Sequence, residues 1–236
     1  MNLPIVILSG GYATRLRPIT EKIPKALIPI NGIPFIDWQL RLIKKQGFEE
    51  VVICLNYKSE MIREFLGNGS RFDLNIVISE DGDTPLGTGG ALKKALGLLG
   101  EKFVVLYGDS YLDFDYKRAE LAFLQTSKSA MMAIYKNQNN YDKSNVQFSK
   151  DMPLKYSKKG KLDTMSYIDF GMNFFNRKAF ENLELGRSFD LSEILEKLSD
   201  KNELEGYEVN DRFYEIGSMI GIKDLSQYLE RKINVI

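Results

Sequence analysis

A glycine-rich run near the start of the chain, LSGGYATRLRPIT, combines residue types that can hold a phosphate chain. Gly10 and Gly11 lack a Cβ atom, so their backbone N–H groups can approach an anion closely. Thr14 adds a hydroxyl, Arg15 adds a planar guanidinium fork, and Lys25 adds a mobile charge ten residues later. We interpret this set as a binding site for a nucleoside triphosphate.

This run differs from the two best-known phosphate-binding motifs. A Walker P-loop is excluded because no Gly-Lys-Ser/Thr follows the glycines, and a dinucleotide fingerprint is excluded because G-x-G-x-x-G is absent. A nicotinamide dehydrogenase is excluded for the same reason. The alternative is a glycine-rich turn with incidental basic residues. The combination of Gly-Gly with Thr14, Arg15 and a later Pro-Lys pair favours the triphosphate site.

A carboxylate at Asp109 follows the apolar run FVVL at residues 103–106, through Tyr107 and Gly108. Open α/β sheets bind ligands at the carboxyl ends of their strands. Because Mg²⁺ prefers one or two carboxylates together with phosphate oxygens, Asp109 is a candidate magnesium ligand. The alternative is that Asp109 only caps a helix or a turn.

The composition of the 236-residue chain restricts the chemistry further. The chain has no His, which excludes Ser-His and Cys-His nucleophile pairs, two-His zinc motifs and the iron facial triad. Its single cysteine, Cys54, lies in the apolar run VVICL and is predicted to be a packed core thiol. The 32 Lys and Arg residues balance 32 Asp and Glu residues, which argues against a nucleic-acid-binding protein.

The chain shows no signal for a membrane or for export. No apolar segment reaches the roughly 18 to 20 residues needed to span a bilayer. The N-terminal MNLP leads into an apolar run without a basic region or a small-residue cleavage site. We therefore expect a cytoplasmic protein that does not bind membranes.

Strand-like and helix-like patterns alternate through the first half of the chain. Short apolar strands joined by helical crossovers predict an α/β fold with a doubly wound, Rossmann-like, mainly parallel sheet and helices on both faces. The strands are expected at residues 5–8, 51–55, 76–78 and 103–106, and the intervening helices around residues 36–43, 62–66 and 91–99.

The second half is less regular and predicts a smaller mixed α/β addition. The aromatic residues Phe170, Phe174 and Phe175 are expected in the core. Because no repeat, low-complexity tract or clean linker is present, we predict a single domain over residues 1–236. Strands are expected at residues 130–135 and 167–175, a helix at 191–198, and polar loops at 136–145 and 155–161.

The pattern GGxxTRLxPxT followed by PK resembles the signature of the sugar-1-phosphate nucleotidyltransferases, also called nucleotide-sugar pyrophosphorylases. The similarity resumes at TPLGTGGA, residues 84–91, and at YGD, residues 107–109, so that it covers roughly residues 3–112. Within the family, the chain is most similar to heptose-1-phosphate guanylyltransferases. Ala13 departs from the pattern, because the family usually has Gly at this position.

The resemblance implies a reaction that needs no histidine. A sugar-1-phosphate attacks the α-phosphorus of a nucleoside triphosphate in line, and pyrophosphate leaves. Because a phosphate monoester is mostly dianionic at neutral pH, with a second pKa of about 6, the nucleophile needs no general base. Positioning and charge neutralisation by Mg²⁺, Arg and Lys then supply catalysis. Residues 1–112 would form the nucleotide-binding half and residues 113–236 the sugar-binding half.

The resemblance also implies roles for individual residues. Arg15, Lys25 and Asp109 would be catalytic. The loop at residues 84–90 would contact the base and ribose before a helix begins at Ala91, and a plain turn between strand and helix is the alternative. The nucleotide-binding set comprises Leu8, Ser9, Gly10, Gly11, Thr14, Arg15, Lys25, Glu80, Pro85, Gly87 and Thr88.

A second metal ligand besides Asp109 is implied by the same resemblance. The family usually supplies an Asp from a late Asp-x-Gly stretch, and the best match is FYEIG at residues 213–217, with Glu215 in place of Asp. The longer Glu side chain can ligate through a shifted backbone or a water molecule. The other interpretation is that the second carboxylate has been lost.

The resemblance is less complete on the sugar side. Lys158 takes the place of the Lys in a Glu-Lys-Pro stretch that binds the sugar phosphate, and a solvated lysine is the alternative. Asp169 replaces an Asn that contacts the sugar, so it would accept hydrogen bonds from hydroxyls without donating any. These departures suggest an acceptor other than glucose 1-phosphate. The sugar-phosphate-binding set comprises Gly108, Asn145, Lys158, Asp169 and Gly171.

The leading hypothesis is Mg²⁺-dependent guanylyl transfer to D-glycero-D-manno-heptose 1-phosphate for surface-polysaccharide synthesis. Cytidylyl or uridylyl transfer to another phosphorylated acceptor is the first alternative, and a non-catalytic nucleotide-binding regulatory module is the second. The expected partners are a nucleoside triphosphate and a sugar-1-phosphate, with no nucleic acid and no membrane. The sequence is compatible with a homo-oligomer but does not determine the oligomeric state.

Overall fold

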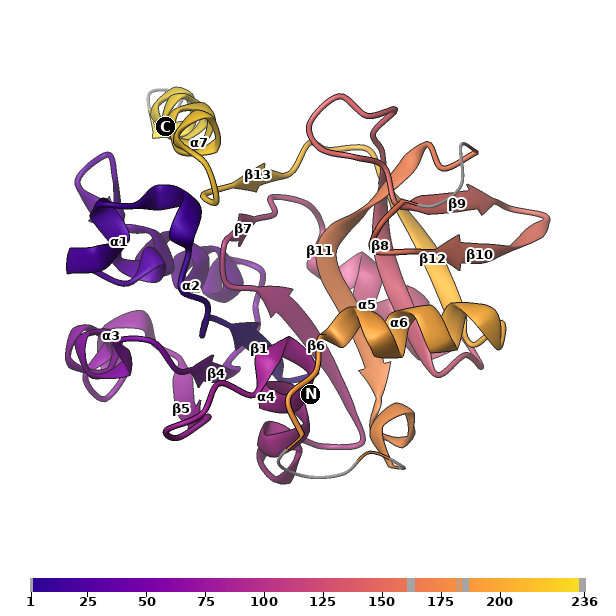
Figure 1. Ribbon diagram of the computed structural model, residues 1–236, viewed down its shortest axis with the longest axis horizontal. Coiled ribbons are helices and arrows are strands. Elements are labelled where there is room, and N and C mark those ends of the chain that lie inside the picture. The colour runs from indigo at the N-terminus through magenta and orange to yellow at the C-terminus, as the bar shows by residue number, and fades with distance from the viewer. Residues whose placement is uncertain (1, 161–163, 182, 184–186, 234–236) are drawn as a thin grey trace.

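The computed structural model describes residues 2–160, 164–181, 183 and 187–233. Its centre is a nine-stranded mixed sheet with the order β10-β9-β11-β6-β1-β4-β5, in which β8 also pairs with β11 and β12 pairs with β8 (Figure 1). The parallel part contains β1 (Ile5–Leu8), β4 (Glu50–Leu55), β5 (Asn75–Glu80) and β6 (Lys102–Tyr107). All four predicted strands of the first half are therefore confirmed.

Helices cover both faces of the parallel strands, as the sequence predicts. α2 (Phe35–Lys45) and α3 (Ser59–Leu66) pack into one hydrophobic core, and α4 (Gly87–Ala95) packs into the other. Along β1, Ile5 and Ile7 point into the first core, and the alternate residues point into the second. Because β1 is buried on both faces, it is a continuous apolar run without polar alternation. The predicted α/β class is confirmed.

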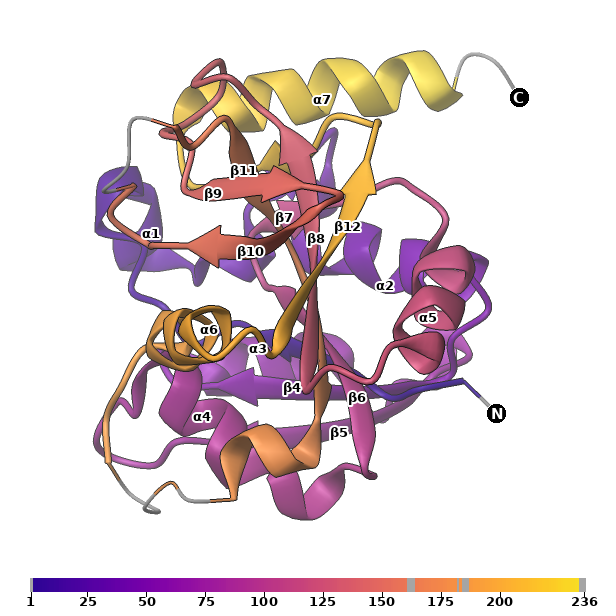
Figure 2. The same cartoon turned by 90° about the vertical axis from the view of Figure 1, so that its right-hand side faces the viewer.

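The second half extends the sheet beyond β6. Here β11 (Tyr167–Asn176) runs antiparallel to β6, and α5 and α6 lie on opposite sides of β8 and β12 (Figure 2). Phe170, Phe174 and Phe175 are buried in the core, as predicted. The other elements are β8 (Ala130–Lys136), β9 (Val146–Ser149), β10 (Met152–Tyr156), β12 (Leu204–Val209), α5 (Tyr116–Gln125), α6 (Leu191–Asp200) and α7 (Met219–Ile233).

Short elements near the carboxyl ends of the parallel strands complete the fold. β7 (Ser110–Tyr111) follows β6 directly and pairs antiparallel with β13 (Tyr214–Glu215). The hairpin of β2 (Pro29–Ile30) and β3 (Ile33–Pro34) leads from the glycine-rich run into α2. The short helix α1 (Ile19–Lys22) precedes this hairpin. Residues about 100 positions apart are thereby brought together beside β6.

Several predicted boundaries differ from those of the structure. α4 begins at Gly87 and not at Ala91, because its glycines allow another segment to pack on the first turn. A Cβ atom on Gly89 would lie only 2.2 Å from the ring of Phe189, and the Gly89 N–H donates to the Phe189 carbonyl at 3.0 Å. The loop predicted at residues 155–161 is shorter, since its first two residues belong to β10, and residue 161 lies outside the described residues.

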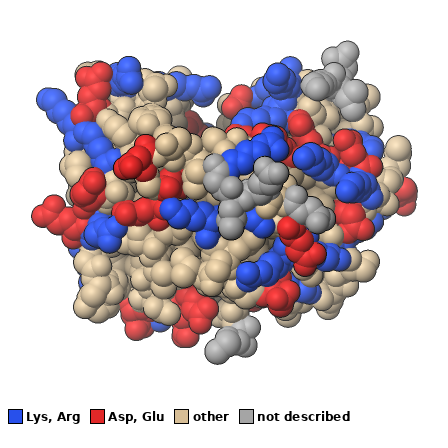
Figure 3. Space-filling model, turned by 60° about the horizontal axis from the view of Figure 1, so that its bottom comes forward, with Lys and Arg blue, Asp and Glu red and all other residues tan. Residues whose placement is uncertain are grey.

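The environment of Cys54 agrees with the prediction of a core thiol. Its side chain is 1% exposed, and burial raises the pKa of the thiol to about 12. On the face shown in Figure 3, acidic and basic side chains are interspersed, in keeping with equal numbers of the two charges. None of the helices in the described part of the chain is long and apolar enough to cross a bilayer.

Candidate functional site

The strand order reverses between β1 and β6, and the candidate site lies at this point. After β1 the chain places β4 on one side, and it later places β6 on the other. Open α/β sheets bind ligands at the carboxyl ends of the strands where the order reverses. Leu8 ends β1 directly beside Tyr107, which ends β6. The loops that follow these two residues therefore face each other across one crevice.

Gly108 brings the two loops close together. Its N–H donates to the carbonyl of Leu8 at 2.9 Å. A Cβ atom at position 108 would lie 2.5 Å from the same oxygen, which is closer than van der Waals contact allows. Only glycine permits this approach, so the packing of the two loops alone explains why residue 108 is glycine.

The first cavity has a volume of about 430 Å³ and opens at the ends of β1 and β6. Gly108, which the sequence assigned to the sugar side, lies here and not in the second cavity described below. The predicted site residues in its lining are Leu8, Ser9, Gly10, Gly11, Lys25, Pro85, Gly87, Thr88, Gly108 and Asp109. Tyr12, Ala13, Cys54, Asp81, Ala91 and Tyr107 complete the lining.

The glycine-rich loop bends sharply at Ala13. This residue has φ 47° and ψ 50°, in the left-handed region, where a Cβ atom costs about 1–2 kcal/mol. The hydroxyl of Thr20 donates to the carbonyl of Ala13 at 3.0 Å and holds the bend. The backbone conformation therefore explains why a glycine is usual at this position, and it shows that alanine is accommodated.

The second cavity is larger, about 1270 Å³, and adjoins the first. Six residues line both cavities: Tyr12, Ala13, Lys25, Thr88, Tyr107 and Asp109. The predicted site residues found only in the second cavity are Thr14, Arg15, Asn145, Lys158, Asp169, Gly171 and Glu215. The two cavities thus gather residues from both halves of the chain around a common wall.

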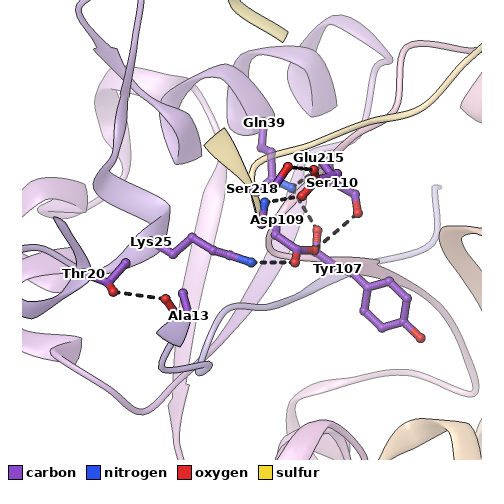
Figure 4. Close-up of polar contacts among 10 residues, drawn as sticks. Ala13, Thr20, Lys25, Gln39, Tyr107, Asp109, Ser110, Glu215 and Ser218 are labelled. Carbon is purple, nitrogen blue, oxygen red and sulfur yellow. Dashed lines mark hydrogen bonds and ion pairs between the residues drawn. The ribbon is translucent and has the colours of Figure 1, made fainter. Parts of the chain in front are cut away.

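An ion pair between Lys25 and Asp109 forms the centre of this common wall. The Lys25 Nζ atom lies 2.7 Å from Asp109 Oδ2, and their side chains are 19% and 39% exposed (Figure 4). Among the described residues, the other carboxylate oxygen, Oδ1, accepts a single long hydrogen bond, of 3.4 Å, from the Ser110 hydroxyl. A charged donor and a carboxylate oxygen therefore face the junction of the two cavities together.

Glu215 lies beside this pair because β13 is hydrogen-bonded to β7. Glu215 is paired with Ser110, and the Ile216 N–H donates to the Asp109 carbonyl at 2.9 Å. The Glu215 carboxylate accepts hydrogen bonds from the Ser218 hydroxyl at 2.6 Å and from the Gly217 N–H. The longer Glu side chain thus reaches the start of α7, where two donors hold it.

The donor set at this wall fits Mg²⁺ only if the substrate contributes ligands. Asp109, in the turn before β7, and Glu215, on the neighbouring strand β13, supply hard carboxylate oxygens. Within the described residues, no group of three or more His, Cys, Asp or Glu side chains could hold a metal ion. Mg²⁺ typically takes one or two carboxylates and completes its shell with phosphate oxygens and water, so the two carboxylates are sufficient.

Asp169 is held firmly in the second cavity. Its Oδ1 accepts from the Gly171 N–H at 3.0 Å and from the Asn173 amide at 3.3 Å. Its Oδ2 accepts from the Tyr107 hydroxyl at 3.3 Å, and its own N–H donates to Asn145 Oδ1 at 2.9 Å. Burial raises the pKa of the Asp169 carboxyl to about 6, although the three donated hydrogen bonds lower it. The carboxylate can therefore take up a proton at mildly acidic pH.

We expect the Asp169→Asn variant to be more stable than the wild type at neutral pH. The raised pKa means that the folded wild type loses stability as pH rises from about 4 to about 6. An amide avoids this loss, so its free energy of unfolding should exceed that of the wild type by about 1–3 kcal/mol near pH 7.5. Urea denaturation at about pH 4 and pH 7.5 checks this. An equal difference at both pH values would contradict it.

Lys158 is paired and not simply solvated. Its Nζ atom lies 2.5 Å from Asp190 Oδ2, and both residues line the second cavity. Asp190 in turn caps α6, because its other oxygen accepts from the Ser192 N–H at 2.9 Å. About half of its side chain is exposed, so the ion pair places Lys158 at the rim of the second cavity without deciding whether it binds a sugar phosphate.

Glu80 is the predicted site residue that the structure does not bring to either cavity. Its carboxylate pairs with Arg63 on α3. The next residue, Asp81, lines the first cavity instead and accepts a hydrogen bond from the Leu86 N–H at 2.9 Å. The prediction missed the lining residue by one position, at the point where β5 ends.

Arg212 is a cavity residue that the sequence did not single out. Its guanidinium carbon lies 4.2 Å from the ring centre of Tyr141 and 4.8 Å from that of Tyr214. It also pairs with Asp224 on α7, and all four residues line the second cavity. No signal could have found it, because Tyr141 lies in a predicted polar loop 71 residues before Arg212.

Comparisons with known proteins identify the family of this chain. A family profile described as Nucleotidyl transferase matches residues 5–232. D-glycero-alpha-D-manno-heptose 1-phosphate guanylyltransferase of Campylobacter jejuni is 30% identical over 90% of this chain and 93% of its own length. The chain belongs to the sugar-1-phosphate nucleotidyltransferases. As a member of this family, the enzyme transfers a nucleotidyl group from a nucleoside triphosphate to a sugar-1-phosphate.

Other similar proteins differ in the substrates that their names state. N-acetylmuramate alpha-1-phosphate uridylyltransferase of Neisseria meningitidis is 27% identical to this nucleotidyltransferase over 93% of the chain and 95% of its own length. The structure of a putative glucose-1-phosphate thymidylyltransferase from Bacillus anthracis superimposes with a TM-score of 0.85 at 20% identity, covering 95% of this chain and 94% of its own. The latter likeness supports the fold alone.

Proposed function

We propose that this nucleotidyltransferase transfers guanylyl groups from GTP to a heptose 1-phosphate in the synthesis of a surface polysaccharide. The observation that carries the proposal is the wall shared by the two cavities, where Lys25 and Asp109 lie 2.7 Å apart. A nucleotide in the first cavity and a sugar phosphate in the second would meet at this wall. The similarity to the Campylobacter jejuni guanylyltransferase supports the choice of base and sugar.

The first cavity suits the nucleoside and the start of its triphosphate. Gly10 and Gly11 offer backbone N–H groups without side-chain obstruction. Thr14 and Arg15, which follow the bend at Ala13, line the second cavity and would reach the outer phosphates from there. Arg15 is exposed and offers a planar fork for two phosphate oxygens.

The chain's own residues would stabilise the negative charge on the oxygens around the α-phosphorus during the transfer. Lys25 would donate to a phosphate oxygen, and its contact with Asp109 orients the lysine side chain. Asp109 and Glu215 would hold Mg²⁺, which supplies neutralisation of phosphate charge when it is bound. The sugar phosphate arrives as a dianion, so none of these residues needs to remove a proton from it.

The second cavity suits a polar acceptor with several hydroxyl groups. Asp169 would accept hydrogen bonds from sugar hydroxyls, and Asn145, whose side chain positions Asp169, lies beside it. Lys158 would exchange part of its contact with Asp190 for the sugar phosphate. The cavity's size, about 1270 Å³, leaves room for an acceptor larger than a hexose phosphate.

Uridylyl transfer is the second candidate function. It is favoured by the similarity to the Neisseria meningitidis uridylyltransferase, which covers 93% of the chain. A regulatory module without catalysis is less well supported, because Arg15, Lys25 and Asp109 all line one continuous pair of cavities. Such a module would not require the complete set.

The test is pyrophosphate release over a grid of nucleotides and sugar-1-phosphates. ATP, GTP, CTP, UTP and dTTP would each be combined with glucose, mannose, N-acetylmuramate and heptose 1-phosphates in the presence of Mg²⁺. We expect release with GTP and heptose 1-phosphate, and lower rates elsewhere. Activity with UTP and N-acetylmuramate 1-phosphate would select the second candidate. A blank grid with nucleotide-dependent thermal stabilisation would favour the regulatory module.

Chelation of divalent metal is expected to abolish the activity. If Asp109 and Glu215 hold Mg²⁺, then EDTA in excess should reduce pyrophosphate release to background, and added Mg²⁺ should restore it. Removal of the metal should leave the melting temperature nearly unchanged, because the Asp109 and Glu215 carboxylates already have hydrogen-bond partners within the protein. Undiminished turnover in EDTA would contradict the proposed metal role.

A further inference from the structure

Gln39 is a polar side chain buried in the middle of α2. It is 2% exposed and faces the turn between β6 and β7. Its Nε2 atom donates to the Tyr107 carbonyl at 3.1 Å and to the Ser110 carbonyl at 2.7 Å (Figure 4). These two carbonyls flank Asp109 along the chain, so one amide group holds the turn on both sides of the carboxylate.

The turn that carries Asp109 is also hydrogen-bonded to two other parts of the fold. The Gly108 N–H ties the turn to β1, and the Ile216 N–H ties it to β13, through the Asp109 carbonyl. Gln39 ties the same turn to α2, which lies on the first core side of the sheet. The backbone at Asp109 is thereby fixed from three separate elements.

The same helix supports the element that carries Lys25. α2 packs against the short 3₁₀ helix Lys25–Leu27, and the Phe35 N–H at its start donates to the Ile28 carbonyl at 3.0 Å. Trp38, next to Gln39, donates from Nε1 to the Ile30 carbonyl at 3.0 Å. One rigid helix therefore sets the position of both members of the Lys25–Asp109 pair.

We propose that Gln39 is a positioning residue that fixes the Asp109 carboxylate relative to Lys25 at the wall between the two cavities. The proposal rests on the role of Asp109 in the proposed function. Burial of the amide brings little net stability, because its Oε1 atom is buried and has no hydrogen-bond partner among the described residues. An apolar side chain would pack here without leaving a buried oxygen unpaired. The contribution of the amide is therefore to hold the turn in place.

Gln46 provides a matched control in the same helix. It caps the end of α2, its Nε2 donates to the Phe114 carbonyl at 2.7 Å, and its Oε1 accepts from the Tyr116 N–H at 3.3 Å. It therefore ties α2 to the chain a few residues beyond the Asp109 turn, and it lines neither cavity. Gln39→Met and Gln46→Met each remove two side-chain hydrogen bonds of similar kind.

We expect Gln39→Met to lower kcat by about 10²-fold, the loss that accompanies a misplacement of about 1 Å. The KM values for nucleotide and sugar phosphate should stay within about 3-fold, because the residues that bind them remain in place. Gln46→Met should retain wild-type kcat, even if the loss of its two hydrogen bonds lowers the melting temperature. A wild-type kcat for Gln39→Met, or equal losses of kcat in both variants, would overturn the proposal.

Hydrogen exchange in the unliganded proteins gives a readout that is independent of activity. Gln39→Met should speed exchange in peptides that contain residues 107–112 and 214–218, since the Ile216 amide bonds to the Asp109 carbonyl. Gln46→Met should speed exchange near Tyr116 instead. Unchanged exchange around Asp109 in Gln39→Met would contradict the proposal. If the wild type released no pyrophosphate, the proposed function would fail. Hydrogen exchange would still test whether Gln39 fixes the turn at Asp109.

Discussion

The Asp109→Asn variant is expected to release pyrophosphate about 10³-fold more slowly than the wild type, which corresponds to about 4 kcal/mol of transition-state stabilisation. Asparagine keeps the size of the side chain but removes the negative charge. Lys25 then loses its ion-pair partner 2.7 Å away, and the site loses a carboxylate that would hold Mg²⁺. The rate should be measured at saturating GTP, sugar phosphate and Mg²⁺, so that the loss appears in kcat.

Asp113→Asn is the matched control for this experiment. Asp113 lies four residues further along, accepts from the Tyr228 hydroxyl at 2.7 Å and pairs with Lys232 on α7. It lines neither cavity, so the substitution should lower stability without lowering kcat. Wild-type turnover of Asp109→Asn in Mg²⁺ would show that the metal and charge assignments are wrong. A similar loss in both variants would point to general damage near β7.

The Arg15→Met variant is expected to lose about 10²–10³-fold in kcat/KM for the nucleotide, the range seen when one donor to a developing charge is removed. Arg15 lines the second cavity directly after the bend at Ala13. Because the guanidinium is exposed, its removal leaves the fold unperturbed. Steady-state kinetics with varied GTP would measure the loss, and the melting temperature should remain that of the wild type.

Arg17→Met is the control for the charge of the loop. Arg17 lies two residues later, is also exposed, and is 4.0 Å from Glu21 in a weak surface ion pair. It lines neither cavity, so its loss should change kcat/KM by less than about 3-fold. If both substitutions weakened the nucleotide reaction equally, the effect would be a general electrostatic one, and Arg15 would have no specific contact with the triphosphate.

Local sequence patterns predicted the strands and helices whose formation depends on residues close together in the chain. The apolar strands and their crossover helices appear where periodicity indicated them, and the strands' carboxyl ends bring Gly10 and Asp109 to one crevice. This follows because a parallel sheet aligns those ends whatever the loops contain. The loop residues themselves predicted a triphosphate site, and the class of reaction came from the resemblance of their motifs to a known family.

Contacts between distant segments do not follow from local patterns. The two-residue strand β13 has too few residues to show a period, yet it brings Glu215 beside Asp109. α4 begins at Gly87, where Phe189, about 100 residues away, packs against its glycines. Gln39 was not singled out from the sequence, because the carbonyls that it binds lie about 70 residues away along the chain.

Transfer of the α-phosphate of GTP, together with its nucleoside, to the sugar phosphate can be followed most directly with labelled GTP. The enzyme would be incubated with heptose 1-phosphate and Mg²⁺, using GTP labelled either at the α-phosphate or at the γ-phosphate. We predict that the α-label appears in the nucleotide sugar and that the γ-label appears in pyrophosphate, with both transfers lost in Asp109→Asn. A γ-label in the sugar product, or an α-label that stays in free GDP or GMP, would contradict nucleotidyl transfer at this site.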